Sequence, residues 1–187
     1  MLSDDNILRG ALVRLTALQP GDVEEMTRDQ EDAGFSRMAS SDPSYPHTAE
    51  ANAAYVKKLL ENPKAYVFVI RPVDDDRFIG FINLEDIEWS NGVADLGMSI
   101  GRRDNWGKGY GAEALSILLR FAFYELNLHR VGLTVFEYNA RAIALYERAG
   151  FVREGADREY VHRDGKRFDM IRYGLLRREW EERLSAG

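Results

Sequence analysis

Three glycines occupy alternate positions in the segment Asn105-Trp106-Gly107-Lys108-Gly109-Tyr110-Gly111-Ala112-Glu113, directly ahead of an apolar stretch of helical period. Glycine lacks a Cβ, so its backbone can adopt positive φ values and let a ligand approach closely. At the start of a helix the first N–H groups have no partner within the helix, and they lie at the positive end of the helix dipole. Such a loop is suited to bind a phosphate or another anion.

The spacing of these glycines matches neither the dinucleotide fingerprint G-x-G-x-x-G nor the phosphate-binding loop G-x-x-x-x-G-K-[ST]. A tight connection in which the glycines only permit the turn is therefore an equally good interpretation of this segment alone.

A second segment, Asn139 to Phe151, places Asn139 and Tyr146 seven residues apart on a predicted helix. Seven residues are about two helical turns, so both side chains lie on one face. Taken alone, such a tyrosine is more often a core aromatic residue with a satisfied hydroxyl group.

Together the two segments resemble the GCN5-related N-acetyltransferases, the GNAT family, over roughly Phe78 to Leu175. The glycine segment is similar to the family's [QR]-x-x-G-x-[GA] loop, with Trp106 at a position where the family often has Gln or Arg. Asn-x-x-Ala-x-x-x-Tyr followed by Gly-Phe resembles its second cofactor-binding segment. Asp95-Leu96-Gly97, the Trp106–Ala114 run and the closing hairpin resemble the branch of ribosomal-protein N-terminal (RimJ/RimL-like) and spermidine acetyltransferases.

The resemblance implies acetyl-CoA as co-substrate and no metal. The backbone N–H groups from Gly107 to Ala112 would bind its diphosphate, and Lys108 would add charge on the solvent side. The pantetheine arm would pair with the strand that ends at Ile100. The residues expected to bind the cofactor are Met98, Ser99, Ile100, Trp106, Gly107, Lys108, Gly109, Tyr110, Gly111, Ala112, Asn139, Ala142 and Tyr146.

The resemblance also implies that Tyr146 is the general acid that protonates the departing thiolate. Asp95 stands where relatives often carry a Glu and is the expected general base, acting directly or through water, with Glu85 as the second candidate. The alternative for Asp95 is a strand-end carboxylate paired with a nearby arginine.

The expected reaction is direct transfer of an acetyl group to a primary amine in a ternary complex. A protein N-terminus, a polyamine and another small amine are all compatible acceptors. No cysteine exists to carry a covalent intermediate. Two alternatives keep the same fold: a transferase for a longer acyl group, and a non-catalytic domain that binds or senses acyl-CoA.

Composition narrows the class of protein further. The formal net charge of −6 argues against a sequence-independent nucleic-acid binder, which needs a basic surface. The absence of cysteine excludes disulfides and thiolate metal sites, and each histidine lacks a ligand pattern. No signal pattern or membrane-length apolar run is present, so the expected location is the cytoplasm and no membrane partner is expected. The closing hairpin could supply an edge strand for a homodimer.

The hydrophobic pattern predicts a single domain over residues 1–187, with residues 1–9 as a polar lead-in. We expect an α+β fold of the GNAT type: a mostly antiparallel, six- to seven-stranded mixed sheet with one splayed strand pair and helices on both faces. Strands are expected at residues 11–15, 65–70, 78–87, 93–100, 130–136, 151–162 and 167–175. Helices are expected at residues 22–32, 49–60, 112–126, 139–149 and 177–184.

Two predicted segments bear on the acceptor. Asp22 is expected to cap the acidic helix at residues 22–32, whose charged face is interpreted as solvated; the alternative is an entrance that attracts a cationic substrate. The loop from Ser40 to His47 is rich in Pro, Ser, Asp and Tyr, a composition typical of loops that line pockets.

Overall fold

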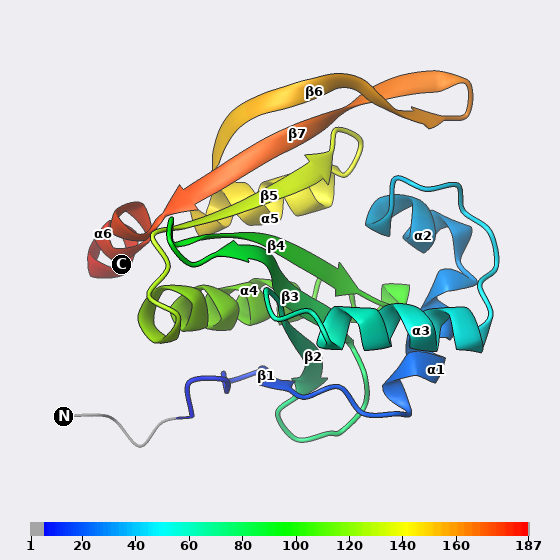
Figure 1. Cartoon of the computed structure of the whole chain (residues 1–187), viewed down its shortest axis with the longest axis horizontal. Coiled ribbons are helices and arrows are strands. Elements are labelled where there is room, and N and C mark those ends of the chain that lie inside the picture. The colour runs from blue at the N-terminus through cyan, green and yellow to red at the C-terminus, as the bar shows by residue number, and fades with distance from the viewer. Residues whose placement is uncertain (1–5, 187) are drawn as a thin grey trace.

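The computed structural model describes residues 6–186, which form a twisted mixed sheet with helices packed against it (Figure 1). Within these residues the sheet has seven strands in the order β1-β2-β3-β4-β5-β7-β6. The strands are β1 (Val13–Thr16), β2 (Tyr66–Pro72), β3 (Gly80–Glu88), β4 (Val93–Ile100), β5 (Arg130–Phe136), β6 (Val152–Arg163) and β7 (Lys166–Leu176). All neighbouring strands are antiparallel except β4 and β5, so the predicted fold class is confirmed.

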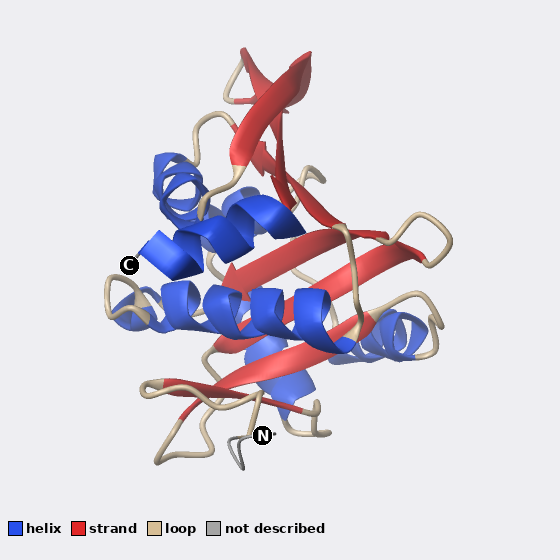
Figure 2. Cartoon of the chain, turned by 90° about the vertical axis from the view of Figure 1, so that its left-hand side faces the viewer, coloured by secondary structure: helices blue, strands red, loops and turns tan. Residues whose placement is uncertain are grey.

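Helices cover both faces of this sheet (Figure 2). They are α1 (Asp22–Gln30), α2 (Ala33–Ala39), α3 (Ala49–Leu60), α4 (Tyr110–Arg120), α5 (Ala140–Ala149) and α6 (Arg177–Ala186). The main core lies between the sheet and α4, because the apolar stripe of α4 meets one face of the central strands. Its fully buried residues include Ile82, Leu84, Leu115, Leu118 and Phe123.

The parallel pair β4 and β5 is bonded only at one end. The register joins Val93 to Arg130, Ala94 to Val131 and Asp95 to Gly132, and it stops there. Beyond Asp95, β4 continues to pair with β3, and β5 continues to pair with β7. The two strands therefore separate after Asp95, which is the predicted splay and leaves one edge of β4 without a strand partner.

The strands and helices that carry the glycine and Asn139 segments lie close to their predicted bounds. Asn139 caps α5 by accepting a hydrogen bond from the backbone N–H of Ala142 (3.2 Å). Gly150 ends that helix at a φ of 102°, in the left-handed region that favours glycine. The helix after the glycine loop begins at Tyr110 and changes to a π-helical turn at Phe121–Glu125.

Three expectations at the N-terminal end were wrong or incomplete. The helix α2 was not predicted, because its seven residues contain Gly34 and show no apolar period. Asp22 does not cap α1; Gly21 holds the N-cap position, and the buried Asp22 carboxylate pairs with Arg71 at 2.7 Å. Of the predicted lead-in, residues 1–5 lie outside the described part of the chain, whereas Leu8 packs against the core.

The tip of the β6–β7 hairpin holds α2 and the loop that follows it. Arg37 forms an ion pair with Asp164 at 2.6 Å. Arg163 Nη2 donates to the backbone carbonyls of Ser40 (2.8 Å) and Asp42 (3.1 Å). These contacts join segments more than 100 residues apart and place the 40–47 loop over the sheet.

Candidate active site

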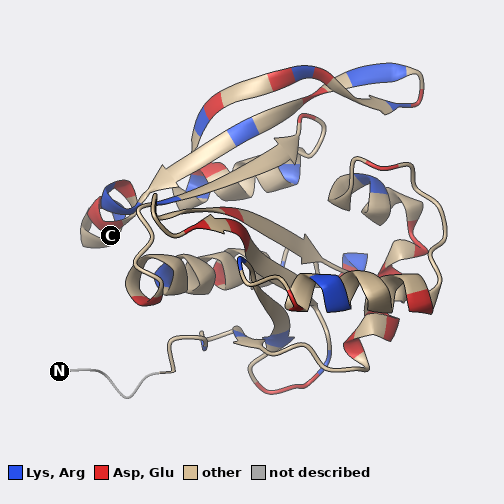
Figure 3. Ribbon diagram, in the orientation of Figure 1, with Lys and Arg blue, Asp and Glu red and all other residues tan. Residues whose placement is uncertain are grey.

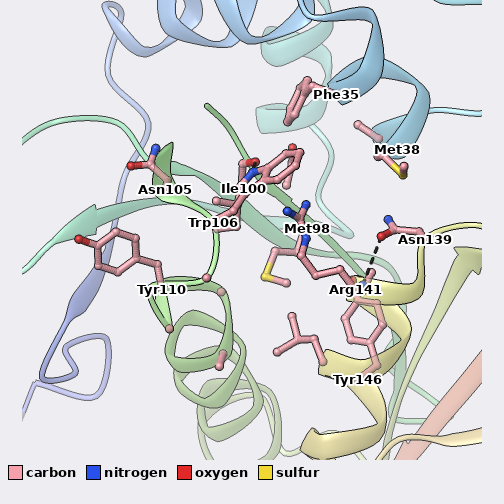
Figure 4. A pocket seen from close by; sticks show the side chains of 18 of the residues that line it. Phe35, Met38, Met98, Ile100, Asn105, Trp106, Tyr110, Asn139, Arg141 and Tyr146 are labelled. Carbon is pink, nitrogen blue, oxygen red and sulfur yellow. Dashed lines mark hydrogen bonds between the residues drawn. The ribbon is translucent and has the colours of Figure 1, made fainter. Parts of the chain in front are cut away.

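A cavity of about 320 Å³ opens where β4 and β5 separate, between the start of α4 and the start of α5 (Figure 4). All the residues predicted to bind the cofactor line it, with the exception of Lys108. Lys108 is exposed on the outer side of the loop and contributes no surface to the cavity. Phe35, Met38 and Arg141 also line it, and sequence reasoning had not assigned them to the site.

The glycine loop presents its backbone to this cavity. Gly107 and Gly109 have φ values of 74° and 85°, which other residues adopt only with strain. Gly109 is the N-cap of α4, and no side chain there accepts a hydrogen bond from the first turn. Within residues 6–186, the backbone N–H groups from Gly107 to Ala112 donate no hydrogen bond to another group of the chain. The loop is therefore a set of outward N–H donors at the positive end of a helix, as an anion site requires.

Glu113 fixes the position of the helix that carries these donors. Its carboxylate accepts hydrogen bonds from the backbone N–H groups of Ala11 (2.9 Å), Leu12 (2.7 Å) and Val13 (2.6 Å). A carboxylate in the first turn is also favoured by the helix dipole. Glu113 thus ties the start of α4 to the start of β1.

Trp106 and Arg141 form a stacked pair at the mouth of the loop. Trp106 donates its indole N–H to the backbone carbonyl of Ile100 (2.9 Å), which fixes the ring at the end of β4. The guanidinium carbon of Arg141 lies 3.4 Å from the centre of the indole ring, a cation–π contact. Among the described residues no carboxylate lies within 4 Å of Arg141, so no ion pair competes with a ligand for its guanidinium group.

Arg141 was missed by sequence reasoning, although one signal could have indicated it. It is the second residue of α5, and a cation is unfavourable at the positive end of a helix. An arginine at that position therefore suggests an anionic partner outside the helix. Burial lowers the pKa of the guanidinium group, which nevertheless keeps its charge.

Tyr146 projects from α5 into the same cavity and is 6% exposed. Its ring packs against Phe151 in an edge-to-face arrangement. Burial raises the pKa of the Tyr146 hydroxyl to about 12. The hydroxyl is therefore protonated at neutral pH, which is the state that a proton donor needs.

Asn139 has only part of its polar capacity free. Its Oδ1 is used by the helix cap, as described above, and within the described chain its Nδ2 donates no hydrogen bond. The side-chain N–H groups are therefore the part of Asn139 that can reach a ligand in the cavity.

The two candidate bases lie together but outside both cavities. Glu85 and Asp95 are paired directly across β3 and β4, on the sheet face away from α4. Burial raises the pKa of Glu85, and the charges of Asp86 and Asp95 raise it further. Burial and the charge of Asp86 raise the pKa of Asp95, although this side chain stays exposed enough for water to screen much of the effect. The charges of Arg130 and Arg172 lower that pKa, but these arginines form their ion pairs with Glu154 and Asp157, so the described residues do not show the alternative of an Asp95 carboxylate paired with an arginine.

A second cavity, of about 340 Å³, lies on the other face of β4, beneath α1, α2 and the 40–47 loop. Phe35, Ala39 and Ser99 line both cavities. The cofactor cavity and this second cavity therefore meet at the strand where the sheet opens. The predicted role of the 40–47 loop as a pocket wall is confirmed, since Ser40, Tyr45 and His47 line the second cavity.

Residues 6–186 hold neither a candidate metal site nor a helix suited to span a membrane. In this part of the chain no three His, Asp or Glu side chains are grouped so that they could hold a metal ion. None of its helices combines the length and the apolar character needed to cross a bilayer.

Comparison with known proteins agrees with this geometry. Residues 13–152 match the family model for the acetyltransferase (GNAT) domain. The chain therefore belongs to the GNAT family of N-acetyltransferases, whose donor is acetyl-CoA.

Two relatives are named for different amine acceptors. The chain is 28% identical to the ribosomal protein uS5-alanine N-acetyltransferase of Escherichia coli, over 73% of this chain and 70% of that one. It is 27% identical to the spermidine N(1)-acetyltransferase of Vibrio cholerae, over 90% of this chain and 95% of that one. The crystal structure of the Vibrio cholerae spermidine N-acetyltransferase with CoA and spermine has the same fold, with a TM-score of 0.82, 24% identity and coverage of 92% of this chain and 99% of that one.

Proposed function

We propose that this acetyltransferase binds acetyl-CoA in the cavity between α4 and α5, and that it transfers the acetyl group to a primary amine that arrives from the second cavity. The observation that carries this proposal is the set of unpaired N–H groups from Gly107 to Ala112 in the same cavity as Tyr146. These donors and Arg141 would bind the diphosphate, because several N–H groups together match its charged oxygens. Met98, Ser99, Ile100, Asn139 and Ala142 would bind the pantetheine arm.

The unpaired edge of β4 supports this placement of the pantetheine arm. An extended chain with amide groups can add to a free strand edge in the way that a further strand does. The sheet offers such an edge beyond Asp95, where β4 no longer pairs with β5. A backbone N–H near Met98 would stabilise the negative oxygen of the tetrahedral intermediate.

The transfer requires that the nitrogen lose two protons and that the departing sulfur gain one. The acceptor is an ammonium at neutral pH, with a pKa of about 10 if it resembles lysine, and must lose one proton before its nitrogen can attack the thioester carbon. The C–N bond forms, the C–S bond then breaks, and the nitrogen loses a second proton. We assign the protonation of the departing sulfur to the Tyr146 hydroxyl and the removal of a proton from the amine to Asp95 or Glu85 through water. The second proton lost by the nitrogen restores the Tyr146 hydroxyl, and the base releases its proton to the solvent, so that one proton is released for each acetyl group transferred.

Release of the CoA thiol tests this function directly. Purified protein with acetyl-CoA should release thiol when it is offered some members of a panel of amines that includes a polyamine, an aminoglycoside and peptides with different N-termini. Calorimetry should separately detect binding of acetyl-CoA without any amine. Binding of acetyl-CoA without thiol release from any amine would favour the alternative of a sensing domain, and no binding at all would contradict the cofactor assignment.

We further propose that the protein works in the cytoplasm as a homodimer. The strand β6 lies at one edge of the sheet and could pair with a second copy. Light scattering after size-exclusion chromatography should then give twice the monomer mass, and a monomer mass at micromolar concentration would contradict this assembly.

A further inference from the structure

One face of β4 connects the candidate bases with the second cavity. Side chains at alternate positions of a strand share a face, so Asp95, Gly97, Ser99 and Gly101 face the same side of the sheet. Ser99 lines the second cavity, and the buried Asn83 side chain of β3 covers Gly97, since a Cβ on residue 97 would lie 2.6 Å from Asn83 Oδ1. The face therefore runs from Asp95 and Glu85 at one end, past the meeting point of the two cavities, to Gly101 at the other end.

A buried carboxylate stands at the Gly101 end. Asp29 of α1 lines the second cavity and is only 8% exposed. A Cβ on residue 101 would lie 1.7 Å from Asp29 Oδ2, so the carboxylate packs directly on the glycine backbone. Figure 3 shows the acidic residues of α1 in red, on the side of the molecule where this cavity lies.

Asp29 has much unused capacity to accept hydrogen bonds. Its Oδ1 accepts one bond from the backbone N–H of Arg102 (3.2 Å), and within the described residues its Oδ2 accepts none. No Lys, Arg or His nitrogen from residues 6–186 lies within 4 Å of it. The neighbouring Gln30, which lines the same cavity, has an Oε1 that is buried and has no partner in this part of the chain. A buried acceptor without a donor is costly, and a ligand with several N–H groups would remove that cost.

The electrostatics of Asp29 agree with this interpretation. Burial raises its pKa to about 6, and the hydrogen bond from Arg102 offsets only part of that rise. The carboxylate is thus mostly ionised at neutral pH; the charge of Arg102 also lowers its pKa, but no ion pair within 4 Å forms among residues 6–186. A positively charged ligand would lower this pKa and stabilise the ionised form.

The other walls of the second cavity suit a ligand that combines methylene groups with ammonium groups. These walls include several aromatic side chains, among them Phe35, Tyr45, Tyr55, Phe78 and Phe81. Tyr45 and His47 stack at 4.3 Å between ring centres. Aromatic rings pack against methylene groups, and their faces attract ammonium groups.

We propose that the second cavity selects a small, flexible primary amine that carries a second positive charge, and that Asp29 binds this second charge. Strands rise by about 3.4 Å per residue, so Gly101 lies roughly 7 Å from Ser99 and roughly 10 Å from Met98 along β4. The two amino groups of the acceptor would therefore be separated by about 7–10 Å. This inference rests on the proposed function, because it assumes that the reacting amine lies where the two cavities meet.

The test compares α,ω-diaminoalkanes of increasing length with the amino alcohols of the same length, in which a hydroxyl replaces the second amino group. Wild-type protein should use the longer diamines with a KM at least tenfold lower than that of the matched amino alcohols. Asp29→Asn keeps the acceptor for the Arg102 N–H but removes the charge. It should raise the KM for the diamines about tenfold and leave the KM for the amino alcohols within twofold.

Glu24→Gln is the matched control, because it removes one negative charge from the exposed side of the same helix. It should leave the preference for diamines within twofold of the wild-type value. Equal KM values for diamine and amino alcohol in the wild-type protein would overturn the inference, and this comparison needs no variant. A loss of preference in Glu24→Gln as large as in Asp29→Asn would also overturn it, since the effect would then be long-range. A KM for a peptide acetylated at its N-terminus that is lower than the KM for every diamine would overturn the assignment of a small acceptor.

Failure of the proposed function gives a different result. If no amine releases thiol, diamine binding can still be measured by calorimetry in the presence of CoA. Diamine binding that is lost in Asp29→Asn would support the amine site while contradicting catalysis. Thiol release at equal KM from diamines and amino alcohols would support catalysis while contradicting the role of Asp29.

Discussion

The two cavities that meet at Ser99 are built in different ways. The cofactor cavity consists mainly of the backbone donors that start α4 and of side chains from the first two turns of α5. The second cavity is assembled from α1, α2, the 40–47 loop, α3 and two strands, and its key polar group is a side chain. A backbone site at a helix start can be recognised from a short motif, whereas a site of separate side chains depends on tertiary contacts between distant segments.

The largest effect is expected for Tyr146→Phe, which should slow the chemical step without weakening the binding of ligands in either cavity. Tyr146→Phe removes the proposed proton donor, and general-acid groups contribute about 10²–10⁴-fold to rate. We expect kcat to fall about 100-fold or more, with the dissociation constant of acetyl-CoA within threefold of wild type. Because the pKa of Tyr146 is raised to about 12, the wild-type rate should show no alkaline decline from this group below pH 10.

Tyr173→Phe is the control for that experiment. Tyr173 is also buried, but its hydroxyl donates to Glu147 (2.9 Å) and it does not line either cavity. Its kcat should stay close to wild type. An equal loss of rate in both variants would mean that buried hydroxyl groups in general, and not proton donation, determine kcat.

Arg141→Ala should affect only the cofactor cavity. Loss of a guanidinium group that binds phosphate should raise the KM for acetyl-CoA about tenfold, equivalent to roughly 1.4 kcal/mol. The KM for acetyl-pantetheine, which has no diphosphate, should not change. Arg158→Ala, on the exposed surface of β6, is the control and should change neither constant. A rise in both KM values for Arg141→Ala would indicate a structural role in place of phosphate binding.

Asp29→Asn, in the second cavity, should change the free energy of unfolding by an amount that depends on pH. The pKa of Asp29 is raised in the folded state, so its contribution to stability is lost as pH rises from about 4 to about 6. Without a bound amine, the free energy of unfolding of the variant at pH 7.5 should therefore exceed that of wild type by an amount on the order of 1–3 kcal/mol. Thermal unfolding should show this as a higher midpoint temperature, and the gain should vanish near pH 4.

Asp32→Asn provides a comparison of opposite sign. Asp32 caps α2, and the hydrogen bonds from Arg103 lower its pKa. Its contribution is present at neutral pH and is lost as pH falls, so this variant should be less stable than wild type at pH 7.5. If thermal unfolding shifted in the same direction for both variants, the burial of Asp29 would not be the cause.

The smallest effect is expected at the hairpin tip. Asp164→Asn weakens the ion pair with Arg37, which is partly exposed and worth about 0.2–1 kcal/mol. The 40–47 loop should become less well positioned, and the KM for the amine should rise two- to threefold while the KM for acetyl-CoA stays constant. An equal rise in both constants would show that the hairpin supports both cavities.

The sequence predicted the cofactor side of the molecule well for physical reasons. The glycine loop, the Asn139 cap and Gly150 are local features whose geometry depends on a few neighbouring residues, and their elements formed as predicted. Arg141 was not predicted because its contact with Trp106 depends on the packing of two helices against one strand end.

The acceptor side was predicted less well. The acidic helix appeared solvated from its sequence, yet Asp29 is buried because it packs on Gly101 and bonds to Arg102, 73 residues away. The helix α2 is short, contains a glycine and depends on the distant hairpin tip for its position. No pattern in a single sequence encodes such contacts.

The central claim is that the backbone N–H groups of the glycine loop bind the diphosphate of coenzyme A. The most direct test is a titration of ¹⁵N-glycine-labelled protein with CoA, followed by NMR. The amide signals of Gly107, Gly109 and Gly111 should shift more than those of Gly21, Gly155 and Gly165, and pantetheine should not reproduce these shifts. Unchanged signals from the three loop glycines at saturating CoA would contradict the account.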